Sequence, residues 1–339
     1  MTLVAINLVV RNGERYIRLC LDAVKKQNYP NLEVTILDNN STDKTADIVA
    51  QEYPEFRLLR SERNLGTWPG QEFLVSKTSG QYIVALSVDV ILEPDFIEQA
   101  IAIFERDKHI GAVQPKIYQY ELMKLPTSDI RHPTSDIIDT CGFEIFRSRR
   151  VTNIGHGQAD RGQYNHERDI FAVEGAAPVL RRSALESIRV KGKFADPEFF
   201  WYGDDLDLAW RMQLFGWRQI YSPKVVAWHD RSTTKSLRRS YLDFIRIRRS
   251  IPLFKRRLDL RNKYLTFIKN DYLINICRDI WPIVKRELAL WLYYLVFEPI
   301  MIVEIFEIVK RIPNMLQQRR EILSHSTRTA SEIHTWFQP

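Results

Sequence analysis

Apolar positions in the first 115 residues alternate between short continuous runs and helical spacing. Residues 3–10, 33–38 and 82–86 are runs of strand length, and the segments between them place apolar side chains three or four positions apart. A continuous apolar run is typical of a strand buried on both faces, whereas the wider spacing is typical of an amphipathic helix. This alternation predicts an α/β fold with a doubly wound, mostly parallel sheet flanked by helices.

The pattern weakens between residues 118 and 175, where we expect short antiparallel strands beside the sheet. It returns at 206–214, which predicts a helix after an acidic cluster, and at 221–228, which predicts a strand that ends at His229. Beyond residue 235 the composition changes to basic helical segments. We therefore predict a first domain over residues 1–235 and a helical extension over residues 236–339.

The net charge of +7 is unevenly distributed. Residues 231–270 contain thirteen Lys or Arg and two Asp or Glu, a net of +11, so the other 299 residues carry −4. Such a basic segment suits nucleic acid or an anionic membrane surface, and a merely solvated helical face is the plain alternative. The segment has no recognised RNA or DNA motif and lies beside an apolar run, which favours the membrane over nucleic acid.

That apolar run is LALWLYYLVF at 288–297, which resumes at 300–303 after Glu298-Pro299. It is too short to span a bilayer, and with its basic neighbours it predicts an interfacial, membrane-associating segment. A buried core helix, a helix packed on the first domain and a homodimer contact are the alternatives. Three isolated cysteines favour a reducing compartment. We therefore expect a cytoplasmic protein, peripheral on the inner face of the plasma membrane.

Polar residues follow the predicted strands, as Asn12, Asp38 and Asp89 do. In doubly wound sheets ligands bind beyond the carboxyl ends of the strands. The segment after the first strand lacks a GxGxxG pattern, and no GxxxxGK[ST] motif is present, so NAD and ATP are not the expected ligands. A carboxylate such as Asp38 can accept hydrogen bonds from a base or a ribose.

Several segments resemble, in order, the family 2 inverting glycosyltransferases, which have a GT-A fold. They are VVRNGERYIRLCLDAVKKQNYPNLEVTILDNNSTDKT, RNLGTWPGQEF, LSVDVILEPDF, EGAAPVLRRSAL, FFWYGDDLDLAWRMQLFGW and VVAWH. The resemblance covers about residues 2–235 and is closest in appearance to the bacterial rhamnosyltransferase-like branch. RNKYLTFIKN at 261–270 is similar to a segment that follows the catalytic domain in that branch.

The resemblance implies a nucleotide-sugar site. Asp38 matches the base-binding aspartate, and Asn12 and Glu14 lie on the loop beside it. Asn64 and Gly66 match an element near the diphosphate. The small residues at 175–177 are expected to let a sugar approach the backbone.

The resemblance also implies a divalent cation, Mg²⁺ or Mn²⁺. Asp89 matches the last acid of the DxD-type motif that holds this cation, and His229 matches a histidine that supplements it. Ser87 stands where a full motif has its first acid, which leaves one carboxylate. An enzyme that needs no metal therefore remains an alternative. Oxygen ligands with one imidazole suit either cation.

Asp204 and Asp205 match the acidic pair whose second member is the general base. An inverting transfer needs one base to take the proton of the acceptor hydroxyl, so Asp205 is the expected base. Either aspartate could instead cap the following helix, and Asp207 is expected to be structural.

The function implied is transfer of a sugar, rhamnose in the branch that looks most similar, from a UDP- or dTDP-linked donor. The acceptor would be a glycan or a lipid-linked glycan in cell-surface polysaccharide synthesis. Ser87 and the unusual Asp204 leave an alternative, a catalytically inactive GT-A-like module that binds glycan or membrane.

Overall fold

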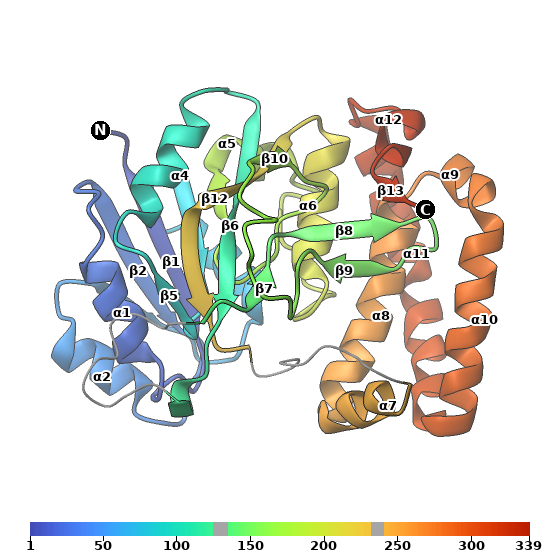
Figure 1. Ribbon diagram of the computed structural model, residues 1–339, viewed down its shortest axis with the longest axis horizontal. Coiled ribbons are helices and arrows are strands. Elements are labelled where there is room, and N and C mark those ends of the chain that lie inside the picture. Colours follow the sequence, from blue (N-terminus) through green and yellow to red (C-terminus); the bar gives the residue numbers. More distant parts are fainter. Residues whose placement is uncertain (125–134, 232–240) are drawn as a thin grey trace.

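The structure, a computed structural model, describes residues 1–124, 135–231 and 241–339. Ten of the described strands form one sheet (Figure 1). They are β1 (Val4–Val10), β2 (Leu32–Asp38), β3 (Arg57–Arg60), β4 (Tyr82–Leu86), β5 (Val90–Leu92), β6 (Ile110–Gln119), β7 (Ile138–Thr140), β10 (Arg168–Asp169), β11 (Val179–Arg181) and β12 (Arg218–His229). Their order is β10-β12-β6-β11-β4-β1-β2-β3, with β5 on β12 and β7 on β6.

The parallel strands of the sheet align their carboxyl ends. Strand β1 runs parallel to β2 and β4, and Val10 at its end pairs with Asp38 at the end of β2. Strands β6 and β12 are also parallel, whereas β11 is antiparallel to both β4 and β6. The polar residues that follow β1, β2 and β4 therefore meet at one edge of the sheet.

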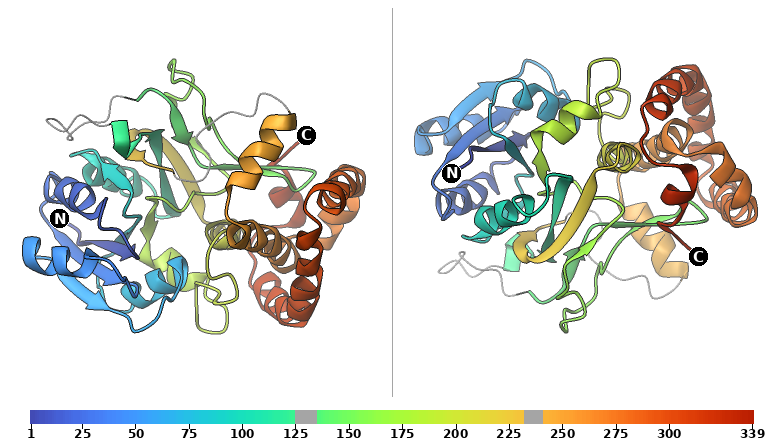
Figure 2. Two further views of the ribbon diagram at one scale, coloured as in Figure 1. Left: turned by 90° about the horizontal axis from the view of Figure 1, so that it is seen from below. Right: turned by 90° about the horizontal axis from the view of Figure 1, so that it is seen from above.

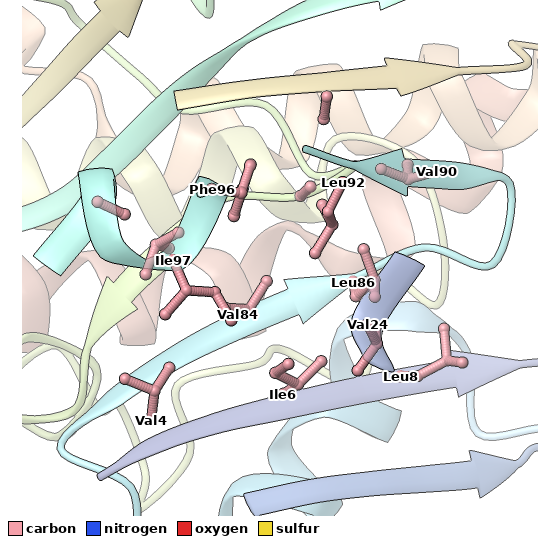
Figure 3. Packing of buried hydrophobic residues seen from close by; sticks show 14 of the residues in the cluster. Val4, Ile6, Leu8, Val24, Val84, Leu86, Val90, Leu92, Phe96 and Ile97 are labelled. Atoms are coloured by element: carbon pink, nitrogen blue, oxygen red, sulfur yellow. The ribbon is translucent and has the colours of Figure 1, made fainter. Parts of the chain in front are cut away.

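Helices cover both faces of the sheet. One face is covered by α1 (Ile17–Lys25), α2 (Thr45–Glu52) and α4 (Phe96–Phe104), and the other by α3 (Thr67–Val75), α5 (Arg182–Ser187) and α6 (Asp204–Leu214). Figure 3 shows Ile6 and Leu8 of β1 packed with Leu86 of β4 and Val24 of α1. Ala5 lies in the core of the opposite face, because side chains alternate along a strand. The predicted α/β fold is confirmed.

The C-terminal third is helical and packs beside α6 (Figures 1 and 2). Its elements are α7 (Tyr241–Ser250), α8 (Leu253–Asn270), α9 (Leu273–Arg278), α10 (Ile280–Phe297), the 3₁₀ helix η2 (Pro299–Val303), α11 (Glu304–Ser324), α12 (Ala330–His334) and β13 (Phe337–Gln338). Strand β13 returns to the first part of the chain and pairs with β8 (Phe143–Phe146), which also pairs with β9 (Val151–Asn153). A second 3₁₀ helix, η1, covers Leu122–Lys124.

The domain boundary expected near residue 235 lies outside the described residues and stays a prediction, as do the contacts of the basic positions at 232–240. Phe337 nevertheless packs against Trp210 and Phe171 of the first part. The C-terminal helices thus share a hydrophobic core with α6 and the sheet.

Residues 288–303 form the end of α10 and η2. Tyr293 and Tyr294 are buried against α8, but Leu288 and Leu292 face outward. No described helix is long and apolar enough to cross a membrane. The alternative of a helix fully buried in the core is wrong for this segment, since one of its faces is exposed.

Candidate active site

The loops after β1 and β2 are held together by hydrogen bonds. The backbone N–H of Asn12 donates to Ser41 Oγ at 2.9 Å, and Asn12 Oδ1 accepts from the N–H of Thr42 at 2.8 Å. Glu14 donates its N–H to Asp43 at 3.1 Å and accepts from the N–H of Lys44 at 3.3 Å. Asn12 and Glu14 therefore shape the rim of the site predicted for the base and ribose.

Asp38 ends β2 directly below this rim. Its side chain is buried, and one carboxylate oxygen accepts from the N–H of Ser41 at 3.2 Å. The neighbouring Asn39 donates to Asn64 Oδ1 at 3.0 Å and accepts from the N–H of Leu65 at 2.8 Å. The segment around Asn64 is thus fixed to the end of β2. This position is compatible with the predicted role of Asn64 and Gly66 near the diphosphate.

Gly66 connects this segment to the acidic pair. Its φ is +92°, and a Cβ at this position would lie 2.2 Å from the carbonyl oxygen of Phe200. Only glycine fits such a close approach at that backbone angle. The next residue, Thr67, donates its N–H to the same carbonyl at 3.1 Å. The loop before Asp204 therefore rests on the loop that holds Asn64 and Gly66.

Asp89 and His229 lie together at the sheet edge. His229 Nε2 is 3.5 Å from Asp89 Oδ2, and its Nδ1 is 2.9 Å from Asp139 Oδ2. Asp139, on β7, is fully buried and holds the imidazole so that Nε2 faces Asp89. Burial alone would lower the pKa of His229, but the two carboxylates reverse this effect and raise that pKa to about 10. Burial opposes ionisation of Asp89, yet His229 keeps the pKa of that carboxyl below its ordinary value.

Arg231 extends this network toward the acidic pair. Its guanidinium donates to Asp139 Oδ1 and to Glu174 Oε1, each at 2.8 Å. Glu174 precedes Gly175, whose backbone N–H donates to Asp205 Oδ2 at 3.1 Å. A continuous series of contacts therefore runs from Asp89 to Asp205.

Gly175 allows Asp205 to approach the backbone. A Cβ on Gly175 would lie 3.2 Å from Asp205 Oδ2, tighter than ordinary van der Waals contact. Ala176 and Ala177 are buried, and the expectation that small residues at 175–177 let a sugar approach the backbone stays a prediction.

Asp204 and Asp205 begin α6, where unpaired backbone N–H groups favour negative charge. Asp205 is half-buried and accepts from the N–H of Leu206 at 2.8 Å, whereas Asp204 is buried and Oδ2 has no hydrogen-bond partner among the described residues. Burial raises the pKa of both carboxyls. The charge of Asp207 adds to this rise for Asp204, and the charge of Asp204 adds to it for Asp205. Glu174 raises the pKa of Asp205 further. A base with an elevated pKa is suited to proton abstraction close to neutral pH.

Helix α8 positions the loop that leads to this pair. Asn262 is buried, and its Nδ2 lies 2.7–2.8 Å from the carbonyl oxygens of Phe199, Trp201 and Tyr202. These carbonyls belong to a loop in which Phe200 and Tyr202 have positive φ. The segment at 261–270 was noted in the sequence only for its resemblance, and in the structure it supports the loop over residues 199–203. We call this loop the acidic loop, because it leads to Asp204 and Asp205.

Asp207 has a structural role, as predicted. It accepts from Arg211 at 2.9 Å, from Lys269 at 3.0 Å and from Asn270 at 2.7 Å. Burial alone would raise the pKa of Asp207, but Lys269 and Arg211 lower it below the ordinary value. These contacts join α6 to α8 through buried charge.

The residues present fit a divalent cation that has two protein ligands. Within residues 1–124, 135–231 and 241–339, no group of three or more His, Cys, Asp or Glu is arranged to hold a metal ion. Asp89 and His229 nevertheless offer one oxygen and one nitrogen, and Asp139 fixes the imidazole as the carboxylate partners of metal-bound histidines do. Mg²⁺ in such sites takes one or two carboxylates and completes its coordination with phosphate and water.

Three residues of this region escaped the sequence analysis. Asp139 lies in a segment of weak periodicity, and Glu174 begins the family-like segment EGAAPVLRRSAL but was given no role; the partners of both are far away in the chain. Lys255 was counted only as part of the basic run. Its ammonium lies 4.6 Å from the centre of the Trp201 ring and is close enough to Asp89 for the two charges to interact.

The predicted site residues thus lie along one edge of the sheet. Asn12, Glu14 and Asp38 surround the ends of β1 and β2, next to Asn64 and Gly66. Asp89 and His229 lie at the ends of β4 and β12, and the acidic pair is joined to both groups. The roles of these residues stay predictions.

Comparison with known proteins places this arrangement in a family. Residues 6–188, more than half of the chain, match the family described as Glycosyl transferase family 2. A mannosyltransferase from Pyrobaculum calidifontis, solved in complex with GDP-Man and Mn²⁺, has 16% identity and a TM-score of 0.51 over 99% of this chain and 87% of that one. The likeness agrees with a GT-A fold.

Curated relatives match over smaller parts. Chondroitin synthase from Pasteurella multocida is 34% identical over 114 residues, which are 33% of this chain and 12% of that protein. Poly-beta-1,6-N-acetyl-D-glucosamine synthase from Staphylococcus epidermidis is 22% identical over 299 residues, which are 86% of this chain and 60% of the relative. The chain spans less than two thirds of the length of either relative.

Proposed function

The chain belongs to glycosyl transferase family 2, and we propose that it is an inverting glycosyltransferase that uses a nucleotide-sugar donor in cell-surface polysaccharide synthesis. The observation that carries the proposal is the contact series from Asp89 through His229, Asp139, Arg231 and Glu174 to the backbone beside Asp205. It joins a cluster of charged side chains suited to a metal-bound diphosphate with a carboxylate suited to a general base.

Asp205 acts as the base in this mechanism. It takes the proton of the acceptor hydroxyl as that oxygen attacks the anomeric carbon, and the bond between sugar and diphosphate breaks on the opposite face. The configuration at the anomeric carbon is therefore inverted. Asp204, which is more deeply buried, raises the pKa of Asp205 and has a positioning role.

The donor binds along the other half of the edge. Asp38, Asn12 and Glu14 hold the base and ribose, while Asn64 and Gly66 lie next to the diphosphate. Asp89 and His229 would hold Mg²⁺ or Mn²⁺, which when bound supplies positive charge to the departing nucleoside diphosphate. The structurally similar mannosyltransferase, which was solved with GDP-Man and Mn²⁺, supports this part of the proposal.

The acceptor is a glycan or a lipid-linked glycan. Relatives named as chondroitin and poly-N-acetylglucosamine synthases support polysaccharide synthesis as the process. We place the enzyme at the cytoplasmic face of the plasma membrane as a peripheral protein. The donor is a UDP- or dTDP-linked sugar, and rhamnose follows only from the branch that the sequence resembles.

A panel of nucleotide sugars tests the proposal. Donor binding to the native state raises its melting temperature, so we expect a shift with one UDP- or dTDP-sugar in the presence of Mn²⁺. The same donor should be slowly hydrolysed without an acceptor, and Asp205→Asn should reduce this turnover while the thermal shift persists. Binding without any hydrolysis or transfer in the wild type would indicate the catalytically inactive module instead.

A further inference from the structure

Helix α10 directs its apolar side chains outward. Trp281, Leu288, Leu292 and Leu295 are 80%, 67%, 62% and 61% exposed, and their spacing of seven, four and three positions places them on one side of the helix. A helix at the surface of a soluble protein has the opposite arrangement, with a polar outer side. This outer face therefore calls for an apolar partner.

Of the charged groups of this helix, Arg286 and Glu287 are only partly exposed, and both are paired. Glu287 accepts from Arg286 at 2.6 Å, from Lys263 at 3.2 Å and from the hydroxyl of Tyr264. Helix α10 therefore does contain polar residues. Glu287 faces α8, while the apolar side chains face outward.

The apolar side continues to the end of α10 and into the elements that follow it. Val296 and Ile300 are 60% and 50% exposed, and Phe306 at the start of α11 is 73% exposed. Glu298, between α10 and η2, is buried and accepts from Arg256 of α8 at 2.6 Å. We call Trp281, Leu288, Leu292, Leu295, Val296 and Ile300 the outer face.

Positive charge accompanies the outer face. Residues 241–339 contain seventeen Lys or Arg and ten Asp or Glu, and several of those acids are buried in ion pairs. Lys285 lies among the exposed apolar positions of α10, and Arg278 is exposed just before the helix. A symmetric contact between two copies would bring these cations together, whereas an anionic bilayer would attract them.

We propose that the outer face docks on a phospholipid bilayer with anionic headgroups, and that α10 lies in the plane of the interface. Leu and Trp side chains enter the boundary between headgroups and acyl chains, and Lys285 and Arg278 contact lipid phosphates. The contact from Glu298 to Arg256 joins this face to the start of α8, whose Lys255 lies over Trp201 in the acidic loop. Docking would bring Asp205 to a lipid-linked acceptor, and in this respect the proposal rests on the proposed function.

Flotation of the full chain with vesicles tests the proposal. The wild type should float with vesicles of 70% phosphatidylcholine and 30% phosphatidylglycerol, roughly tenfold or more better than the double variant Leu288→Gln and Leu292→Gln. Glutamine keeps the size and helix propensity of leucine, and the neutral change leaves the charge intact. Met123→Gln, at an apolar side chain that is 82% exposed on η1, is the matched control and should float as the wild type does.

Each other outcome is informative. Equal flotation of wild type and double variant would exclude the outer face as the docking site. A wild type that stays with the buffer as a dimer, and a double variant that is monomeric by light scattering, would assign the face to a second copy. Hydrolysis of the donor in solution should be the same in both proteins. If neither protein hydrolyses any donor but flotation differs as expected, the docking surface stands and the proposed function fails.

Discussion

At the residue scale, Asp205 carries the first prediction. Asp205→Asn keeps the shape of the side chain but removes the proton acceptor, so transfer should fall by roughly 10²–10⁴-fold. Donor affinity, measured by thermal shift, should change little because Asp205 faces Gly175 rather than the predicted nucleotide pocket. Unchanged transfer in this variant would remove Asp205 from the mechanism.

The pH profile is a second prediction for the same residue. Burial, Asp204 and Glu174 raise the pKa of Asp205, and only the ionised carboxylate accepts the proton. The transfer rate should therefore fall as the pH is lowered and Asp205 becomes protonated. This fall should occur at a pH above about 4, the ordinary pKa of aspartate. Glu174→Gln removes one negative charge and should move this acidic limb to lower pH. If the acidic limb of the pH–rate profile stays in place in Glu174→Gln, a group other than Asp205 controls the rate at low pH.

The cation gives a third prediction. EDTA should abolish transfer and Mn²⁺ should restore it, and Asp89→Ala should raise the Mn²⁺ concentration needed or eliminate turnover. Thermal shift with Mn²⁺ and UDP measures binding independently of turnover. Full activity in EDTA would show that the serine at position 87 marks an enzyme that needs no metal, with basic side chains such as Lys255 next to the diphosphate.

At the scale of elements, α8 is expected to hold the acidic loop. Asn262→Ala leaves three carbonyl oxygens without their donor, at a cost of about 1–3 kcal/mol in the free energy of unfolding. Because those carbonyls precede Asp204 and Asp205, transfer should fall more than stability alone explains. Asn275→Ala is the control, since Asn275 is equally buried but donates to Ala330, away from the site. Equal effects of both variants on transfer would contradict a role in positioning.

At the scale of the whole molecule, Arg149 links three parts of the chain. It lies between β8 and β9, donates to Asp271 at 2.6 Å and to Asp279 at 2.7 Å, and packs over Phe337 of β13. Arg149→Met removes the ion-pair partner of the buried Asp271 and leaves Asp279 with His334, so the free energy of unfolding should decrease by about 3–5 kcal/mol. Urea denaturation checks this value against Arg150→Met, the exposed neighbour, which should have little effect. A small loss in Arg149→Met would show that water replaces the pairing.

The sequence by itself determined the order of strands and helices and the position of the main polar residues. The periodicity of apolar positions is a local property, and parallel strands place the residues that follow them at one edge. Asn12, Asp38 and Asp89 could therefore be predicted as neighbours of one site before any contact was known, whereas Asp205 was assigned to it only by the family resemblance.

Tertiary structure decided the contacts that support those residues. Asp139 and His229 are 90 positions apart, and Asn262 is 60 positions from Tyr202, so no local pattern reveals that they meet. The outer face of α10 was visible in the sequence only as an apolar run. Which of its side chains turn inward is set by Lys263 and Tyr264 of α8, because the half-buried Glu287 is paired with both.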